Sequence, residues 1–286
     1  MDRKALVACL SLLLASCSSR NTIVVGSKNF TEQVLLGEIL AQQIERQLGT
    51  TVIRKLDLGG TLLAHEAVAG GAIDLYPEYT GTALTTVLKQ PPASDPGAVL
   101  ESVRNAYHRQ WQLAWHDPLG FNNTFAMIVR REEKIASLSD AARVHPWRMG
   151  VGYEFQQRPD GLDGLLKAYN LRLSGNVVTM DLGLLYSALQ SHKVDVIAAN
   201  STDGLISVLD VAVLEDDRRY FPPYQCAVVA REATLARYPR LRGILEQLSG
   251  RLSDAAMRRL NYQVDGAHRP VAQVAAEFLK TLPPAP

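Results

Sequence analysis

Short runs of β-branched residues and segments with apolar residues every three to four positions follow one another along the chain. This pattern predicts strands and helices in turn. The β-branched run at 22–25 predicts a strand, and a polar stretch at 26–33 follows it. Apolar residues four apart then mark one face of an amphipathic helix: Leu36, Leu40, Ile44 and Leu48. Asn29 and Glu32 have the spacing of a capping box for that helix. Open α/β sheets bind ligands at such a loop, so the polar stretch is a candidate site segment.

The same order of elements is predicted twice. Strands at 22–25, 51–56 and 72–76, with helices between them, form a first β-α-β-α-β set, and a second set occupies about 127–200. The chain then returns through a strand at 225–230 to amphipathic helices that continue to residue 279. Alternating strands and helices are typical of parallel sheets covered by helices. We therefore expect an α/β protein of two similar lobes joined by two crossings, with the helical tail on the first lobe and hinge closure around a ligand.

The first residues have the pattern of a targeting segment. Arg3 and Lys4 precede an apolar run at 5–14 that is too short to span a membrane as a helix. The sequence Leu14-Ala15-Ser16-Cys17 is similar to a bacterial lipoprotein signal, which is cut before a lipidated cysteine. We expect residues 1–16 to be a signal peptide, 17–21 a tether and Cys17 a lipid anchor that holds the exported protein at a membrane. An ordinary secretory signal is the alternative.

Composition excludes several other classes of protein. Once the signal and the anchor cysteine are set aside, only Cys226 remains, so no intramolecular disulfide is possible. Removing Asp2, Arg3 and Lys4 takes the formal net charge from +1 to zero, which argues against nucleic acid as a partner. The six histidines are dispersed, and no Gly-x-Ser-x-Gly or phosphate-loop pattern occurs. We expect no enzyme activity, no metal and no cofactor.

Six short motifs in a fixed order resemble one family, over about 23–279. They are Gly26-Ser27-Lys28-Asn29-Phe30-Thr31-Glu32-Gln33, Tyr76-Pro77-Glu78-Tyr79-Thr80-Gly81-Thr82, Gly120-Phe121-Asn122-Asn123-Thr124, Arg158-Pro159-Asp160-Gly161, Ser201-Thr202-Asp203-Gly204 and Phe221-Pro222-Pro223-Tyr224. The family is that of the solute-binding receptors of bacterial ABC importers for quaternary amines such as glycine betaine, choline and carnitine. Phe125 departs from the family, which often has tyrosine after Asn-Asn-Thr.

The resemblance implies a fold, a location and a set of partners. The fold is the two-lobed periplasmic-binding-protein type II with two crossover strands, with lobe 1 at 22–124 and 222–286 and lobe 2 at 125–221. The receptor is an exported monomer, in the periplasm or on the outer face of the cell membrane. It closes on a quaternary amine and delivers it to a permease, whose ATPase supplies the energy. Other trimethylated amino-acid derivatives, including betaines of histidine type, stay open as ligands.

A trimethylammonium group carries charge but has no N–H to donate, so aromatic faces and carboxylates must hold it. Tyr79 is predicted just past a strand end and Tyr224 at the return crossing, where a cleft is expected. Both are candidate cage residues, with Phe125 and Tyr153 as weaker candidates. Packing in the core is the alternative for each ring.

Polar residues in the motifs suit the rest of the ligand. Arg158 could clamp a carboxylate, or it could pair with Asp160 or Asp163. Glu32 and Asp203 could face the cation, or they could cap a helix and stabilise a turn. Neutral groups are expected from Thr31, Asn123, Thr124 and Thr202.

Two rival functions remain on such a fold. One is a receptor for another small zwitterion, an amino acid or an oxyanion, where a carboxylate facing an ammonium group would replace the aromatic faces. The other is an exported enzyme, which would need a nucleophile and a base converging in the cleft. The arrangement of Tyr79, Phe125 and Tyr224 relative to any Ser–His or Cys–His pair separates these functions.

Overall fold

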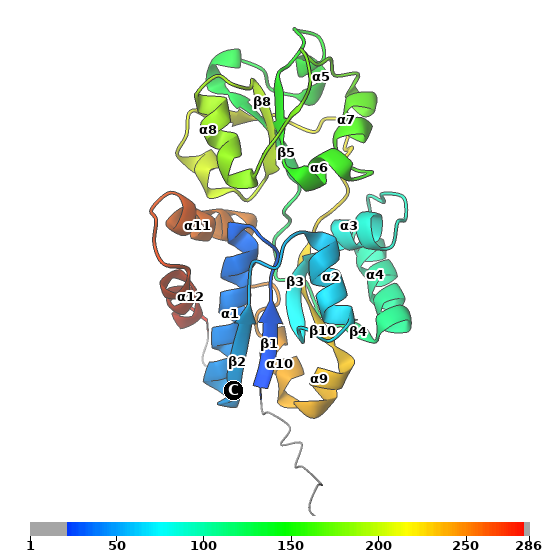
Figure 1. Cartoon of the computed structure of the whole chain (residues 1–286), viewed down its shortest axis with the longest axis vertical. Coiled ribbons are helices and arrows are strands. Elements are labelled where there is room, and N and C mark those ends of the chain that lie inside the picture. Colours follow the sequence, from blue (N-terminus) through cyan, green and yellow to red (C-terminus); the bar gives the residue numbers. More distant parts are fainter. Residues whose placement is uncertain (1–21, 283–286) are drawn as a thin grey trace, which may run out of the picture.

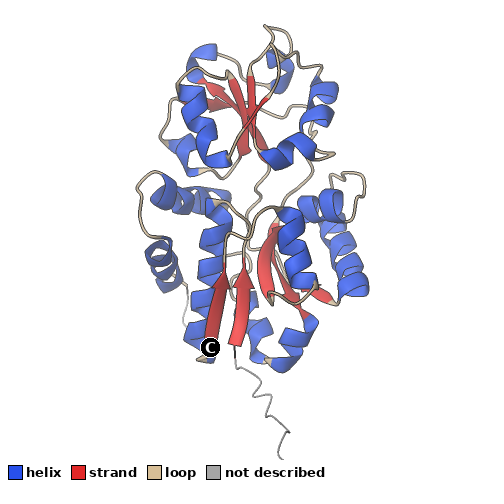
Figure 2. Cartoon of the chain, viewed as in Figure 1, coloured by secondary structure: helices blue, strands red, loops and turns tan. Residues whose placement is uncertain are grey.

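Two lobes are stacked along the long axis of the molecule in the computed structural model, which describes residues 22–282 (Figure 1). Each lobe holds a five-stranded sheet with helices on both faces (Figure 2). The predicted signal peptide, tether and Cys17 lie outside the described residues. The α/β class and the two-lobed type II architecture are confirmed.

The first sheet has the strand order β2-β1-β3-β10-β4. Its strands are β1 (Thr22–Gly26), β2 (Thr51–Lys55), β3 (Leu75–Tyr79), β4 (Leu113–Trp115) and β10 (Cys226–Arg231). β1 pairs in parallel with β2 and β3, whereas β10 runs antiparallel between β3 and β4. The third strand lies further along the chain than the predicted 72–76, so Tyr79 is its last residue and pairs with Cys226. The Cys226 thiol is fully buried.

Helices of the first lobe cover both faces of this sheet. They are α1 (Thr31–Leu48), α2 (Thr61–Ala69), α3 (Thr80–Thr82), the π-helical turn η1 (Ala83–Val87), α4 (Pro96–Trp111), α9 (Glu232–Arg237), α10 (Arg240–Glu246), α11 (Asp254–Asp265) and α12 (Val271–Lys280). The predicted apolar face of α1 is confirmed, because Leu36, Leu40 and Ile44 are buried in the core. The helical tail belongs to this lobe, because Val274 and Leu279 of α12 join the same core.

The second sheet repeats the pattern with the order β7-β6-β8-β5-β9. Its strands are β5 (Phe125–Arg130), β6 (Met149–Val151), β7 (Val178–Thr179), β8 (Val196–Asn200) and β9 (Val211–Val213). The helical elements are α5 (Leu138–Ala141), α6 (Tyr153–Gln157), α7 (Leu162–Tyr169), α8 (Leu185–Gln190) and the 3-10 turns η2 (Arg131–Glu133), η3 (Leu182–Leu184) and η4 (Gly204–Ser207). β5 is antiparallel to β8, so the parallel part of the predicted second set begins at β6.

Two segments cross between the lobes, and each leads into the antiparallel strand of the sheet it enters. Asn122 and Gln225 form a bridge between the crossings. β5 begins three residues after Asn122, and β10 begins directly after Gln225. We propose lobe boundaries at these crossings, with lobe 1 at 22–124 and 222–286 and lobe 2 at 125–221.

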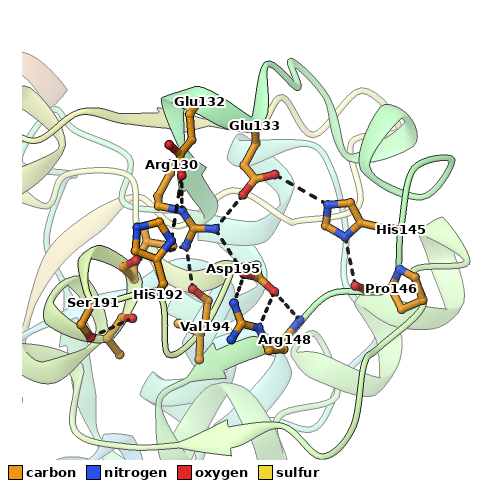
Figure 3. Close-up of polar contacts among 12 residues, drawn as sticks. Arg130, Glu132, Glu133, His145, Pro146, Arg148, Ser191, His192, Val194 and Asp195 are labelled. Atoms are coloured by element: carbon orange, nitrogen blue, oxygen red, sulfur yellow. Dashed lines mark hydrogen bonds and ion pairs between the residues drawn. The ribbon is translucent and has the colours of Figure 1, made fainter.

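Ion pairs fix one end of the second sheet (Figure 3). Arg130, the last residue of β5, donates to Glu133, to Asp195 and to the backbone carbonyl of Val194. Asp195 also accepts two hydrogen bonds from the Arg148 guanidinium, which help to lower the pKa of that carboxyl to about 2. These residues tie β5, β6 and the start of β8 together, and none of them lines the cleft described below.

Candidate functional site

A cleft of about 780 Å³ lies between the lobes and brings most of the predicted site residues together. This volume is in the range of small-molecule sites. Nine of the eleven predicted ligand-binding residues line it: Thr31, Glu32, Tyr79, Asn123, Phe125, Tyr153, Arg158, Asp203 and Tyr224. The described residues that line the cleft include no Ser, Cys or His. Among these described residues, no Ser–His or Cys–His pair therefore converges on the cleft.

Thr124 and Thr202 do not line the cleft. Thr124 lies at the first crossing, where its backbone N–H donates to the Ser201 hydroxyl at 3.1 Å. Thr202 is fully buried, and its hydroxyl donates to Glu32 at 2.5 Å. Each residue bonds to another side chain and lies outside the cleft lining, so direct contact with a ligand is not expected from either.

Glu32 is a buried carboxylate surrounded by neutral donors. Its Oε1 accepts from the Tyr79 hydroxyl at 2.7 Å and from the Asn123 amide at 2.8 Å. Its Oε2 accepts from the Thr202 hydroxyl at 2.5 Å and from the Asn261 amide at 2.9 Å. Burial raises the pKa of this carboxyl, and the four hydrogen bonds oppose that shift. The chain therefore holds a desolvated carboxyl group at the wall of the cleft.

The predicted capping box is wrong. The N-cap of α1 is Phe30, and it makes no side-chain capping bond. Asn29 lies one residue before the N-cap, and its backbone N–H donates to the carbonyl of Gly59. The reason is positional: Glu32 is the second residue of the helix, and its carboxylate accepts hydrogen bonds from four side chains of other segments instead of capping α1.

Two more acidic side chains line the cleft close to Glu32. Asp203 accepts from the Tyr186 hydroxyl at 3.0 Å and from the backbone N–H of Asn200 at 3.1 Å. Burial and the nearby charge of Glu32 raise the pKa of Asp203 to about 7. Asp265 accepts from the Thr31 hydroxyl at 2.6 Å, and burial raises the pKa of this carboxyl as well.

The aromatic side chains fall into two groups. Tyr79 stacks against Phe30, with ring centroids 6.3 Å apart, and the Lys28 ammonium lies 5.1 Å from the Tyr79 centroid. Phe125 packs against Tyr224 and Phe155, with centroids 5.7 Å and 4.8 Å apart. Tyr153 is the exception, because more than half of its surface is exposed at the start of α6.

Arg158 is already paired with Asp160. Its Nε and Nη2 donate to the two oxygens of Asp160 at 2.9 Å and 2.6 Å. The guanidinium also lies 5.1 Å from the Phe125 centroid and 5.6 Å from the Tyr224 centroid. The salt bridge that the sequence left open as an alternative is therefore present. Together with Lys28 over Tyr79, protein cations lie over three of the four candidate cage rings.

Sequence reasoning missed several residues of the cleft. Phe30 lies inside the first motif, and Tyr186, Asn261 and Asp265 lie outside all six motifs, yet all four line the cleft. Asn261 and Asp265 come from α11, far from any strand end. The only signal in the sequence is that Asn261 follows Met257 by four residues, which places both on one face of a helix. The structure shows that both residues are buried.

Residues 22–282 contain neither a metal-binding cluster nor a membrane-spanning helix. Among residues 22–282, no group of three or more His, Cys, Asp or Glu side chains is arranged to hold a metal ion. In the same range, no helix combines the length and the apolar character needed to cross a membrane.

The chain is similar to substrate-binding proteins of one transport system. The family model described as the substrate binding domain of ABC-type glycine betaine transport system matches residues 21–281. The carnitine transport binding protein of Listeria monocytogenes is 32% identical over 284 residues, covering 94% of this chain and 92% of that protein. The glycine-betaine-binding protein of Pseudomonas aeruginosa is 34% identical over 295 residues, covering 97% and 93%.

A longer relative and two solved structures extend the comparison. The ergothioneine transport permease/ergothioneine binding protein of Helicobacter pylori is 34% identical over 283 residues, and this chain spans about half of its length. The crystal structure of a glycine betaine/carnitine/choline ABC transporter matches with a TM-score of 0.75 and 31% identity, covering 90% of this chain and 97% of that one. A lactococcal protein closed on glycine betaine matches with a TM-score of 0.63 at 15% identity, which shows the fold alone.

Proposed function

We propose that the cleft binds a trimethylated amine, because the chain belongs to the family of substrate-binding domains of ABC-type glycine betaine transport systems. Members of this family bind solutes for transport and are not enzymes. The relatives named above are glycine-betaine-, carnitine- and ergothioneine-binding proteins, so these compounds and choline are the first ligands to test.

Unpaired negative charge in the cleft supports this proposal most strongly. Glu32, Asp203 and Asp265 all line the cleft, and within residues 22–282 none of them forms an ion pair with Lys or Arg. Among the described residues that line the cleft, two are basic, and each forms an ion pair with a protein carboxylate: Lys28 with Glu78 and Arg158 with Asp160. Buried charges are costly unless they are compensated. A cationic ligand would supply the missing counter-charge.

The hydrogen bonds of Glu32 favour a quaternary amine over an ammonium ion. A carboxylate offers about four acceptor sites, and four donors already occupy those of Glu32. An ammonium group would find no free acceptor on it. A trimethylammonium group needs none, because it is attracted by charge and by the aromatic face of Tyr79.

The opposite end of the ligand has fewer partners. Four N–H groups of Arg158 donate to Asp160, Thr82 and Thr85, which leaves one of the five guanidinium N–H groups. That N–H can donate a single hydrogen bond to a ligand carboxylate. The bidentate clamp expected from the sequence would require displacement of Asp160.

Calorimetric titration with methylated and unmethylated pairs tests the proposal. We expect glycine betaine, carnitine, choline or ergothioneine to bind, and glycine, which keeps the carboxylate but not the methyl groups, to bind at least tenfold more weakly. Thermal shift gives an independent reading, because a ligand that binds only the folded state raises its apparent stability. Equal affinity for glycine and glycine betaine would contradict a site built for a quaternary amine.

The same titration should depend on pH in a defined direction. The pKa of Asp203 is about 7 without ligand, and a bound cation favours the ionised carboxylate. Affinity should therefore rise by up to about tenfold between pH 6 and pH 8, with release of a proton on binding near pH 7. Without ligand, the raised pKa means that the folded state holds this proton more tightly. Stability should then fall as pH rises from about 4 to about 7.

We further propose that the receptor is a lipid-anchored monomer that serves an ABC permease and its ATPase. The anchor rests on Cys17, which follows the short apolar run. Replacing Cys17 by serine should move the exported protein from the membrane fraction to a soluble fraction, which fractionation and immunoblotting would show. Membrane association that persists in this variant would contradict the anchor.

A further inference from the structure

A side chain of one lobe caps a helix of the other. Glu154 lies in α6 of lobe 2, and its carboxylate accepts hydrogen bonds from the backbone N–H and the side-chain hydroxyl of Thr61, the latter at 3.0 Å. Thr61 is the first residue of α2 in lobe 1. This contact crosses the cleft, because Gly60 and Glu154 both line it.

The helix has no cap of its own at this end. The N-cap position of α2 is Gly60, which makes no side-chain capping bond, and the first turn contains no acidic residue. Free N–H groups and the positive end of the dipole favour a carboxylate there. A Cβ on Gly60 would lie 2.3 Å from Oε1 of Glu154, so glycine leaves the space that the carboxylate fills.

The contact continues into the ligand cleft. The Thr61 hydroxyl that donates to Glu154 accepts a hydrogen bond from the Lys28 ammonium at 3.0 Å. Lys28 is buried against Glu78 at 2.5 Å and lies over the ring of Tyr79. The position of Glu154 is thereby coupled to the loop that follows β1 and lines the cleft.

We propose that Glu154 is an interlobe latch, which caps α2 when the cleft closes and so sets the population of the closed state. Glu154 is exposed at the surface, so water can solvate its carboxylate when the lobes separate. The contact is therefore easily reversed, as a latch must be. The inference rests on lobe closure as part of the proposed function, but it does not depend on which ligand binds.

Small-angle scattering of the ligand-free protein tests the latch without any ligand. Glu154→Gln and Glu154→Ala should lower the ratio of closed to open molecules by about five- to tenfold, seen as a larger radius of gyration. Gly60→Ala should do the same by obstructing the carboxylate. Matched controls are Gln157→Ala on the same helix and Gly243→Ala, whose new Cβ would have no neighbour within 4 Å.

A double-mutant cycle separates the latch from general damage. Gly60→Ala should not change the radius of gyration further once Glu154 is alanine, because both changes remove the same contact between Glu154 and Thr61. Additive effects, or an unchanged radius of gyration in all variants, would overturn the latch. Circular dichroism and thermal unfolding confirm that each variant is folded.

Dissociation kinetics provide the second reading, with glycine betaine as the probe. Loss of the latch should raise the dissociation rate about five- to tenfold, since the ligand leaves from the open state. If glycine betaine, carnitine, choline and ergothioneine all fail to bind, the proposed function is wrong. The radius of gyration of the ligand-free variants still tests the latch in that case. If glycine betaine binds and Glu154→Gln changes neither its dissociation nor the scattering, the latch alone is overturned.

Discussion

Glu32→Gln should weaken quaternary-amine binding by about 30- to 100-fold. A unit charge about 5 Å from the cation, at an effective dielectric constant of about 20, contributes roughly 3 kcal/mol, and glutamine removes it while keeping the shape of the side chain. Part of the effect is offset because the variant no longer has to hold a desolvated carboxylate. Calorimetric titration with the ligand that binds wild type most tightly measures the loss.

The same substitution should lower the stability of the ligand-free protein. Both oxygens of Glu32 accept two hydrogen bonds each, and the glutamine Nε2 that replaces one of them can accept none. Two buried donors would then lose their acceptor, which costs more than the glutamine gains because it carries no charge to desolvate. Thermal unfolding of the ligand-free variant measures this loss.

A control on the same helix excludes a general effect of charge. Glu45 of α1 pairs with Arg54 and does not line the cleft. Glu45→Gln should leave binding unchanged. Wild-type affinity in Glu32→Gln would mean that this carboxylate is not the counter-charge of the ligand, and the proposal would lose its main support.

Tyr79→Leu should weaken binding by about tenfold or more, because leucine keeps apolar area but removes the aromatic face. Tyr79→Phe keeps the face and loses the hydroxyl. That hydroxyl donates to Glu32 at 2.7 Å, so we expect a loss of several-fold and a further rise of the Glu32 pKa. In a calorimetric titration, affinity should fall in the order wild type, Tyr79→Phe, Tyr79→Leu. Circular dichroism confirms that each variant is folded.

Tyr224 serves as the comparison. The Arg158 guanidinium lies over its ring, and its hydroxyl donates to Asp160 at 2.5 Å. We therefore expect Tyr224→Leu to loosen the pair of Arg158 and Asp160 as well as the cleft, with a loss of about tenfold. If leucine binds as well as tyrosine at both positions, neither ring recognises the ligand's charge.

Strands, lobes and the location of the cleft could be predicted because they follow from local pattern. β-branched runs, the apolar face of α1 and the motifs at strand ends each depend on residues close in sequence. The third strand was placed too early because Pro77 and Glu78 are unusual strand residues. Pairing with β10 on one side and burial on both faces hold them in β3 nevertheless.

The electrostatics of the site could not be predicted in the same way. The environment of Glu32 is made by Tyr79, Asn123, Thr202 and Asn261, which are up to 229 positions away. Nothing in the sequence distinguishes Glu32 as a capping residue from Glu32 as a buried charge. The sequence leaves the pairing of Arg158 with Asp160 open as an alternative. Only the structure shows that Asp160 takes the Nε and Nη2 donors that a ligand carboxylate would need.

Cys226 offers a practical route to a fluorescent sensor. Within residues 22–282 it is the only cysteine; it is fully buried in β10, and burial raises the pKa of its thiol well above the usual value. Alkylating dyes react with exposed thiolates, so this sulfur is protected from them. A cysteine introduced at the exposed Leu63 could then be labelled selectively. A dye there, beside the end of α2 that meets the opposite lobe, would convert lobe movement into an optical signal for assays of small molecules.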